Sequence, residues 1–483
     1  MTSKIFHRSL TASYPSAIGG QGCYVVTGDG RQILDGSSGA AVSCLGHGNP
    51  EVTDAIVAQA QAMSFAHTSF FTSDPAEELA KVMMEKSDGA FCRMMLLCSG
   101  SEAVESALKL ARQYHVYRGQ PQRIKIIGRM HSYHGNTLGA LAAGNNPPRR
   151  KTYAPILSPS FHHVSRCFHA ADGPDLEEQV YEDQLIAEFE AKFHELGPET
   201  IAAVIVEPVV GATLGSVPAT STYLPRLKEL CHRHGALIIF DEVMCGMGRV
   251  GTYHAWQHEK LGGVAPDLQT IGKGLGAGYQ PISAVLIGQG VYDTFQAGAD
   301  GAQAFLSGHT YQGHAIGCAA ALAVARIVHR DQLLANVVRM GDLLETTLRQ
   351  QLPPIFTERG GSIRGLGLFR TVDFGHLGDA FGAKAPLAAQ VAAETLAQGA
   401  AVYTCSVAVD AILFAPPYII TRAEILTLVR AFLRALDVVL QQRGSGNSNG
   451  IGNAIGDGIQ PLVESNGIGD GIGDGMQPLI ERL

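Results

Sequence analysis

Residues 236–243 read Ala-Leu-Ile-Ile-Phe-Asp-Glu-Val, an apolar run that ends abruptly in two acids. A short run that is apolar at every position and rich in Ile is typical of a strand buried on both faces of a parallel sheet. Residues 202–206 repeat this pattern and are followed by Glu207. Between the two runs, residues 223–234 carry apolar side chains at helical spacing. The sequence therefore predicts a strand–helix–strand unit and an α/β fold.

Asp241 is placed at the carboxyl end of the predicted strand, where open α/β sheets bind their ligands. Because strand side chains alternate between faces, Asp241 and Val243 are expected to point the same way. One of them can then touch the edge of a flat ring and the other its surface. A carboxylate beside a pyridine nitrogen keeps that nitrogen protonated, which makes the ring an electron sink.

Lys273 lies between Gly272 and Gly274, just after the strand-like residues 268–271. Glycines on both sides leave the amine free of neighbouring side chains and open to a flat ligand, as expected of a lysine that forms a Schiff base. An exposed loop lysine is the alternative interpretation, and it is the more common one for such a segment alone. The presence of Asp241 upstream favours the Schiff-base lysine.

A phosphate site is predicted at residues 98–103, which read Cys-Ser-Gly-Ser-Glu-Ala. They follow the apolar residues 94–97 and precede residues 104–114, whose apolar positions have helical spacing. Free amide N–H groups at a helix start, next to small residues, bind anions. A plain helix N-cap is the alternative, and the presence of Asp241 and Lys273 favours the phosphate site.

Taken together, six separated motifs carry a family resemblance over roughly residues 10–440. In chain order they are Gly100-Ser101-Glu102-Ala103 with Lys109-Leu110-Ala111-Arg112, Tyr133-His134-Gly135, Glu207-Pro208, Asp241-Glu242-Val243 with Gly246-Met247-Gly248-Arg249, Lys273 in its glycine frame, and His309-Thr310-Tyr311. This set resembles the class III aminotransferases, pyridoxal-phosphate enzymes of fold type I.

The resemblance implies a role for each side chain around the cofactor ring. Lys273 would hold the cofactor as a Schiff base and shuttle the substrate proton. Asp241 would pair with the pyridinium nitrogen, while Tyr133 and Val243 would cover the two ring faces. Glu207 would lie near the ring. An ordinary core role is the alternative for Tyr133 and Val243.

The resemblance also implies how the phosphate is bound. The amides of Gly100 and Ser101, with the Ser101 hydroxyl, would bind it within one chain. Thr310 would reach the phosphate of the neighbouring subunit, so the family pattern implies a homodimer with shared active sites. A plain turn residue is the alternative for Thr310.

Fold type I further implies two domains with a mostly parallel, seven-stranded type of sheet in the larger one. Residues 1–45 and 325–442 are expected to form a smaller α+β domain, and residues 46–324 the large cofactor-binding domain. From residue 443 the chain becomes rich in Gly, Asn and Asp, and residues 455–464 recur almost unchanged at 472–481. Such a segment is expected to be a flexible appendage.

The substrate is less well defined by sequence. Many relatives that handle ornithine-like or 4-aminobutyrate-like amines carry an arginine where this chain has Leu413, and a gating glutamate where it has Ala212. Arg422 instead matches the mobile carboxylate-binding arginine of amine:pyruvate-type relatives. A surface charge on the first turn of the last helix is the alternative for Arg422.

The activity expected from this resemblance is a ping-pong transamination between a primary amine or ω-amino compound and a 2-oxo acid. Two alternatives remain open at this stage. A class III relative can keep the cofactor site and catalyse isomerisation, racemisation, decarboxylation or phospho-lyase elimination. A non-catalytic cofactor-binding partner protein is disfavoured, because Lys273 and Asp241 are both present.

Composition limits the remaining function classes. The 36 basic and 44 acidic residues give a net charge of -8, so neither nucleic acid nor an anionic membrane is expected as a partner. None of the nine cysteines forms a Cys-x-x-Cys pair, which favours a reducing compartment. Because no cysteine or acid completes a ligand set beside the paired histidines, no metal is expected. No targeting segment stands out, and a cytoplasmic location is predicted.

Overall fold

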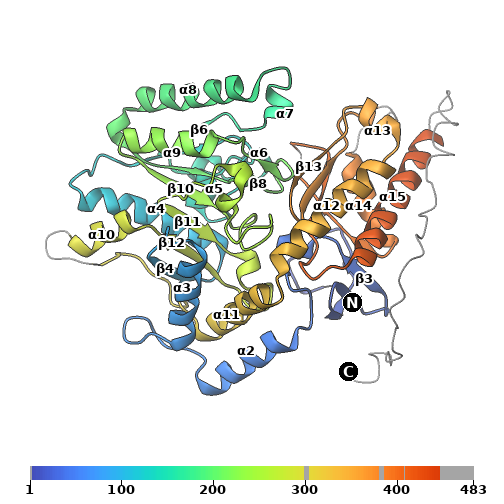
Figure 1. Cartoon of the computed structure of the whole chain (residues 1–483), viewed down its shortest axis with the longest axis horizontal. Helices are drawn as coiled ribbons and strands as arrows, with labels where there is room; N and C mark the ends of the chain where they lie inside the picture. The colour runs from blue at the N-terminus through green and yellow to red at the C-terminus, as the bar shows by residue number, and fades with distance from the viewer. Residues whose placement is uncertain (1–2, 299–303, 380–385, 407, 446–483) are drawn as a thin grey trace.

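The computed structural model describes residues 3–298, 304–379, 386–406 and 408–445. The helices and strands of the two chain ends lie to one side of a large helix-flanked sheet (Figure 1). The duplicated segment predicted to be a flexible appendage lies outside the described residues.

A seven-stranded sheet forms the centre of the larger part. Its strands, in spatial order, are β4 (Arg93–Leu97), β12 (Ser283–Ile287), β11 (Leu268–Ile271), β10 (Leu237–Asp241), β7 (Ile201–Val206), β5 (Lys125–Arg129) and β6 (Phe161–Val164). β12 is antiparallel to β4 and β11, whereas the other neighbouring pairs are parallel. The predicted α/β class with a mostly parallel sheet is thereby confirmed.

Both faces of this sheet are buried, and alternate strand residues enter two separate hydrophobic cores. In β10, Ile238 and Phe240 face one core, while Leu237 and Ile239 face the other. This alternation explains why the strand is apolar at every position. It also directs the next side chain, that of Asp241, toward the second core and its helix α4 (Gly100–Tyr117).

Helices cover each face. On the side of α4 lie α5 (Leu138–Ala143) and α10 (Gln289–Ala297). The opposite core includes α2 (Pro50–Ala62), α3 (Asp74–Lys86), α8 (Glu178–Leu196), α9 (Tyr223–Arg233) and α11 (Ala315–Arg330). The predicted helices at 104–114 and 223–234 correspond to α4 and α9, so helical spacing located both correctly.

Two four-stranded sheets build the smaller part. One has the order β1 (Ala17–Gln21), β2 (Tyr24–Thr27), β3 (Gln32–Asp35), β15 (Ala400–Ala401), and the other β13 (Ser362–Leu366), β14 (Phe369–Asp373), β17 (Ala411–Phe414), β16 (Tyr403–Thr404). They pack with α12 (Leu333–Gln351), α14 (Leu387–Ala397) and α15 (Arg422–Ser445). The short elements α1 (Ser38–Ala41), α6 (Pro147–Arg150), α7 (His169–Asp172), α13 (Pro354–Glu358), β8 (Val209–Val210) and β9 (Val217–Pro218) connect the larger ones.

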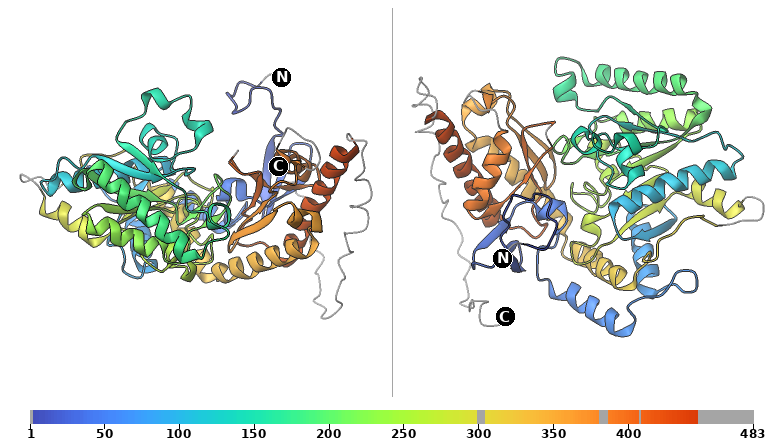
Figure 2. Two further views of the ribbon diagram at one scale, coloured as in Figure 1. Left: turned by 90° about the horizontal axis from the view of Figure 1, so that it is seen from above. Right: turned by 180° about the vertical axis from the view of Figure 1, so that it is seen from behind.

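The two chain ends meet in the first of these sheets, where β3 pairs in parallel with β15 through Leu34 and Ala400. Both rotated views show the N-terminal strands beside the C-terminal elements (Figure 2). The domain boundary predicted between residues 324 and 325 falls inside α11, which is one continuous helix from residue 315 to residue 330. The residue limits of the two domains stay predictions.

Arg249 joins the two parts. Its buried guanidinium donates from Nη1 to the carbonyl oxygens of Leu368 at 3.1 Å and Pro416 at 2.6 Å, and it lies 4.6 Å from the ring centroid of Tyr418. The hydroxyl of Tyr418 donates in return to the Met247 carbonyl oxygen at 3.0 Å. The Gly-Met-Gly-Arg motif therefore holds the C-terminal segment against the loop that follows β10.

Candidate active site

A cavity of about 860 Å³ lies where β5, β7 and β10 end. Its lining comes from segments far apart in the chain, which the parallel sheet brings to one edge. It includes seven of the residues predicted from sequence: Gly100, Ser101, Tyr133, Glu207, Asp241, Val243 and Lys273.

Asp241 is buried and held by three hydrogen bonds. Its Oδ2 accepts from His134 Nδ1 at 2.8 Å, and its Oδ1 accepts from Thr270 Oγ1 at 3.0 Å and from the amide of Val243 at 3.1 Å. These contacts fix the carboxylate at the cavity wall. Neither His134 nor Thr270 was assigned a role from the sequence, although His134 follows Tyr133 directly in one of the family motifs.

Lys273 begins the single turn η5 (Lys273–Leu275) directly after β11 and Gly272. Its φ is 42°, a conformation that a residue with a side chain adopts at a cost. Burial lowers the pKa of the Lys273 amine, while the carboxylates of Asp241 and Glu207 oppose this shift. A lowered pKa increases the neutral fraction of the amine, the form that attacks a carbonyl carbon.

The glycines on either side of Lys273 differ in how closely they are packed. A Cβ atom on Gly272 would lie 3.4 Å from Val243 Cγ1, and one on Gly274 would lie 3.3 Å from Met247 Cβ. The contact at Gly274 is tighter than ordinary packing, whereas a Cβ atom at Gly272 would make an ordinary contact with the loop after β10.

The first turn of α4 forms the predicted anion end of the cavity. Ser99 is the N-cap, and its Oγ accepts from the Glu102 amide at 3.2 Å. Gly100 and Ser101 come next, where helix amides have no partner within the helix. Ser101 Oγ accepts from the amide of Asn136 at 2.9 Å. This turn thus places small residues and an α-helix start at the cavity.

Glu207 fixes the loop that holds Tyr133. Its carboxylate accepts from the Tyr133 amide at 3.4 Å and from the Gly211 amide at 3.2 Å. Burial raises the pKa of Glu207. A second buried acid, Glu242, accepts from the amides of Ala255 at 2.6 Å and Trp256 at 2.9 Å. Glu242 thus holds backbone in place beside Asp241.

Two predicted residues are not brought to this cavity. Thr310 is exposed, and Arg422 is exposed as the first residue of α15; neither belongs to the described lining. Ala212 does line the cavity, whereas Leu413 is buried in β17. The predicted roles of Thr310 and Arg422 stay predictions.

One group in the described ranges has the composition of a metal site, and none of its three members lines the cavity. Glu190, His194 and His234 offer ligand atoms within 4.8 Å of one another. The carboxylate of Glu190 already pairs with Arg233 and with His234 Nε2, so we assign the group as an ion-pair cluster. In the described part of the chain, no helix is both long and apolar enough to cross a membrane.

The sequence profile of the family described as aminotransferase class-III matches residues 14–436. The chain belongs to the class III aminotransferases. An aminotransferase of Schizosaccharomyces pombe is 38% identical, with coverage of 89% of this chain and 94% of the relative. The diaminobutyrate–2-oxoglutarate transaminase of Halomonas elongata is 32% identical, with coverage of 87% and 90%.

Solved omega transaminases share the fold over about nine-tenths of this chain. The omega transaminase of Pseudomonas jessenii in complex with PMP has a TM-score of 0.82 and 30% identity, with coverage of 90% of this chain and 94% of that one. An (S)-enantioselective omega transaminase of Thermomicrobium roseum has a TM-score of 0.80 and 32% identity, with coverage of 89% and 94%. This class III aminotransferase is therefore a pyridoxal-phosphate-dependent transaminase of fold type I.

The cavity of this aminotransferase fits that cofactor. A Cβ atom on Gly100 would lie 2.7 Å from Val243 Cγ1, so only glycine lets the start of α4 approach Val243 this closely. Asp241 supplies a buried carboxylate, Lys273 an amine, and the first turn of α4 an anion site. A flat, phosphorylated pyridine needs this combination of groups.

Proposed function

We propose that this transaminase moves an amino group between a primary amine or ω-amino compound and a 2-oxo acid, with Lys273 and Asp241 as its catalytic residues. The convergence of Lys273, Asp241 and the start of α4 on one cavity carries this proposal. The likeness to omega transaminases supports the donor class, and a Halomonas relative named for 2-oxoglutarate supports the acceptor class.

Pyridoxal phosphate, when bound, supplies a carbonyl carbon for the amine and a protonated ring that withdraws electrons from the substrate. Lys273 Nζ would bond to that carbon and, once released by the substrate amine, remove the proton from the substrate carbon that bears nitrogen. Asp241, oriented by His134 and Thr270, would hold the proton on the pyridine nitrogen. Gly100 and Ser101 would bind the phosphate.

Tyr133 and Val243 would cover the faces of the ring and exclude water from it. Both line the cavity, and Val243 packs tightly against Gly100. Glu207 would keep Tyr133 in place through its amide. These three side chains orient the site without taking part in proton transfer.

We also propose a homodimer in which Thr310 binds the phosphate held by the partner subunit. Thr310 is exposed within a surface region rich in apolar side chains, which favours a protein interface. The exposed fractions are 78% for Phe70, 67% for Phe71, 76% for Leu306 and 58% for Tyr311.

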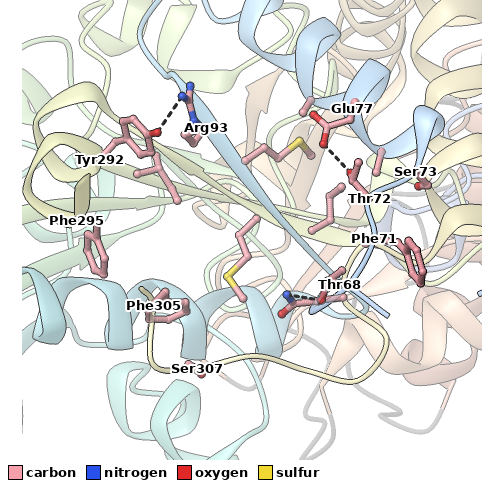
Figure 3. Close-up of a pocket in the computed structure, with 18 of the residues that line it drawn as sticks. Thr68, Phe71, Thr72, Ser73, Glu77, Arg93, Tyr292, Phe295, Phe305 and Ser307 are labelled. Atoms are coloured by element: carbon pink, nitrogen blue, oxygen red, sulfur yellow. Dashed lines mark hydrogen bonds between the residues drawn. The ribbon is translucent and has the colours of Figure 1, made fainter. Parts of the chain in front are cut away.

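A second cavity of about 680 Å³ lies next to these loops and is lined in part by Phe71, Ser307 and Gln312. Figure 3 shows Phe71, Phe295 and Phe305 around it, with a hydrogen bond of 3.0 Å between Arg93 and Tyr292. Its described lining includes none of the predicted catalytic residues. We attribute this cavity to the subunit interface, and we propose that the dimer is cytoplasmic.

Cofactor attachment and amino transfer provide the test. Borohydride reduction of the purified enzyme followed by peptide mapping is expected to place the cofactor on Lys273, and Lys273→Ala is expected to fold but to lose that adduct. A screen of amines with pyruvate and 2-oxoglutarate, read by the change in cofactor absorption, is expected to identify the donor. A label on another lysine, or no donor that converts the cofactor, contradicts the proposal.

A further inference from the structure

Arg149 is a cavity residue that sequence analysis did not single out. It lies in the short helix α6, and its exposed guanidinium lines the same cavity as Lys273 and Asp241. The guanidinium carbon is 5.2 Å from the ring centroid of Tyr133. This distance allows a cation–π contact, so Arg149 is placed directly beside a residue proposed to cover the cofactor ring.

The backbone fixes the start of α6 beside the Tyr133 loop. The amide of Asn145 donates to the Ser132 carbonyl oxygen at 3.1 Å, and the Arg149 amide donates to the Asn146 carbonyl oxygen at 3.0 Å. The backbone at Arg149 is therefore held in place by the loop that carries Tyr133. The side chain of Arg149 can still change its conformation to contact a ligand.

Charge in the cavity points to an anionic ligand. Within the described ranges, Arg149 forms no ion pair, and a second cation, Arg8, also lines the cavity. The acids in the described lining are Asp241 and Glu207, and both already accept hydrogen bonds from the protein. An unpaired guanidinium offers a planar fork of donors that matches a carboxylate.

Asn146 is a second polar side chain in the wall of this cavity. Its side chain is 6% exposed and lines the cavity, yet its Oδ1 has no hydrogen-bond partner among the described residues. The Nδ2 group of the same amide is a hydrogen-bond donor and can contribute to binding an anion beside Arg149.

We propose that Arg149, assisted by Arg8 and Asn146, binds the carboxylate of the substrate acid in this cavity. The inference rests on the proposed transfer to a 2-oxo acid and gives that acid its binding group. Leu413 and Ala212 cannot pair with a carboxylate, and Arg422 lies outside the described lining. Arg149 is thus a specificity residue, which acts on substrate binding without moving a proton.

The test compares Arg149→Ala and Arg149→Gln with a matched control, Lys151→Ala. Lys151 is an exposed cation two residues further along, and it does not line the cavity. The first measurement is calorimetric titration of each holoenzyme with glutarate, an unreactive dicarboxylate. We expect both Arg149 variants to bind glutarate about 10- to 100-fold more weakly, the usual range for loss of a charge-assisted contact, and the control to match wild type.

The second measurement follows the half-reaction of the aminated enzyme with pyruvate, 2-oxoglutarate and an uncharged aldehyde. We expect Arg149→Ala to lower the efficiency of the half-reaction with both oxo acids by about 10- to 100-fold. The efficiency with the aldehyde, which has no carboxylate, is expected to stay unchanged. Loss with both oxo acids places the 1-carboxylate at Arg149, whereas loss with 2-oxoglutarate alone places the distal carboxylate there.

The inference is overturned if both Arg149 variants bind glutarate and react with oxo acids as well as wild type does. It is also overturned if only Arg422→Ala loses glutarate affinity and efficiency with oxo acids. The two proposals fail separately. If the holoenzyme binds glutarate through Arg149 but transfers no amino group, the proposed function is wrong and the carboxylate site stands. If amino transfer proceeds equally well without Arg149, only the carboxylate site is wrong.

Discussion

Gly100→Ala tests the packing that shapes the cofactor site. The added Cβ would lie 2.7 Å from Val243 Cγ1 and 3.2 Å from Val243 Cγ2. Carbon atoms in contact are normally about 3.5–4.0 Å apart, so the new methyl group overlaps Val243 by close to an ångström. Either Val243 moves toward the proposed ring position, or the first turn of α4 withdraws from the phosphate position.

Overpacking of this kind costs about 1–3 kcal/mol, which corresponds to roughly 5- to 150-fold in an equilibrium constant. We expect the dissociation constant for pyridoxal phosphate, measured by absorbance titration of the apoenzyme, to rise within that range. Gly290→Ala is the matched control, since a Cβ atom on Gly290 in α10 meets nothing within 4 Å.

Val243→Ala supplies the second arm of a double-mutant cycle, because it removes both atoms that the new methyl group would strike. We expect Gly100→Ala to cost less than about 0.5 kcal/mol in that background, as coupling between contacting residues predicts. An equal loss with and without the Val243 methyl groups would refute the steric reasoning. So would a Gly100→Ala enzyme that binds the cofactor as wild type does.

Three further predictions concern catalysis, the subunit interface and acid stability. Asp241→Asn is expected to bind the cofactor but to lose amino transfer by at least about 100-fold, or 2.7 kcal/mol, because an amide cannot hold the pyridinium proton; turnover within about threefold of wild type contradicts the assigned role. Mixing inactive Lys273→Ala with Thr310→Ala subunits should restore sites that combine an intact lysine with the partner's intact threonine, and unchanged activity after subunit exchange argues against shared sites. Burial lowers the pKa of His254 from its ordinary value of 6.5 to about 3. As the pH falls below 6.5, the unfolded chain therefore binds a proton at His254 that the folded chain does not. The free energy of unfolding decreases as a result, by about 1.4 kcal/mol at pH 5.5 relative to pH 8. Urea unfolding of His254→Gln should show a correspondingly weaker pH dependence, and an identical pH dependence would disprove this assignment.

The sequence determined the elements whose pattern is local. The apolar run at 236–243 identified β10 because a strand buried on both faces has no polar position before its end. Helical spacing located α4 and α9, since a helix repeats its buried face every three to four residues. The family motifs selected Lys273, Asp241 and the start of α4 as candidate site residues, and all three line one cavity.

Only the tertiary structure decided which distant groups meet. Asp241 is oriented by His134, 107 positions away in the chain, and no local pattern encodes that pairing. The cavity position of Arg149 depends on the backbone hydrogen bond from Asn145 to Ser132, while Arg422 lies outside the described lining on the exposed start of α15. Local spacing specifies strands and helices, but the meeting of side chains at a sheet edge depends on strand order and loop packing, which arise only when the whole chain has folded.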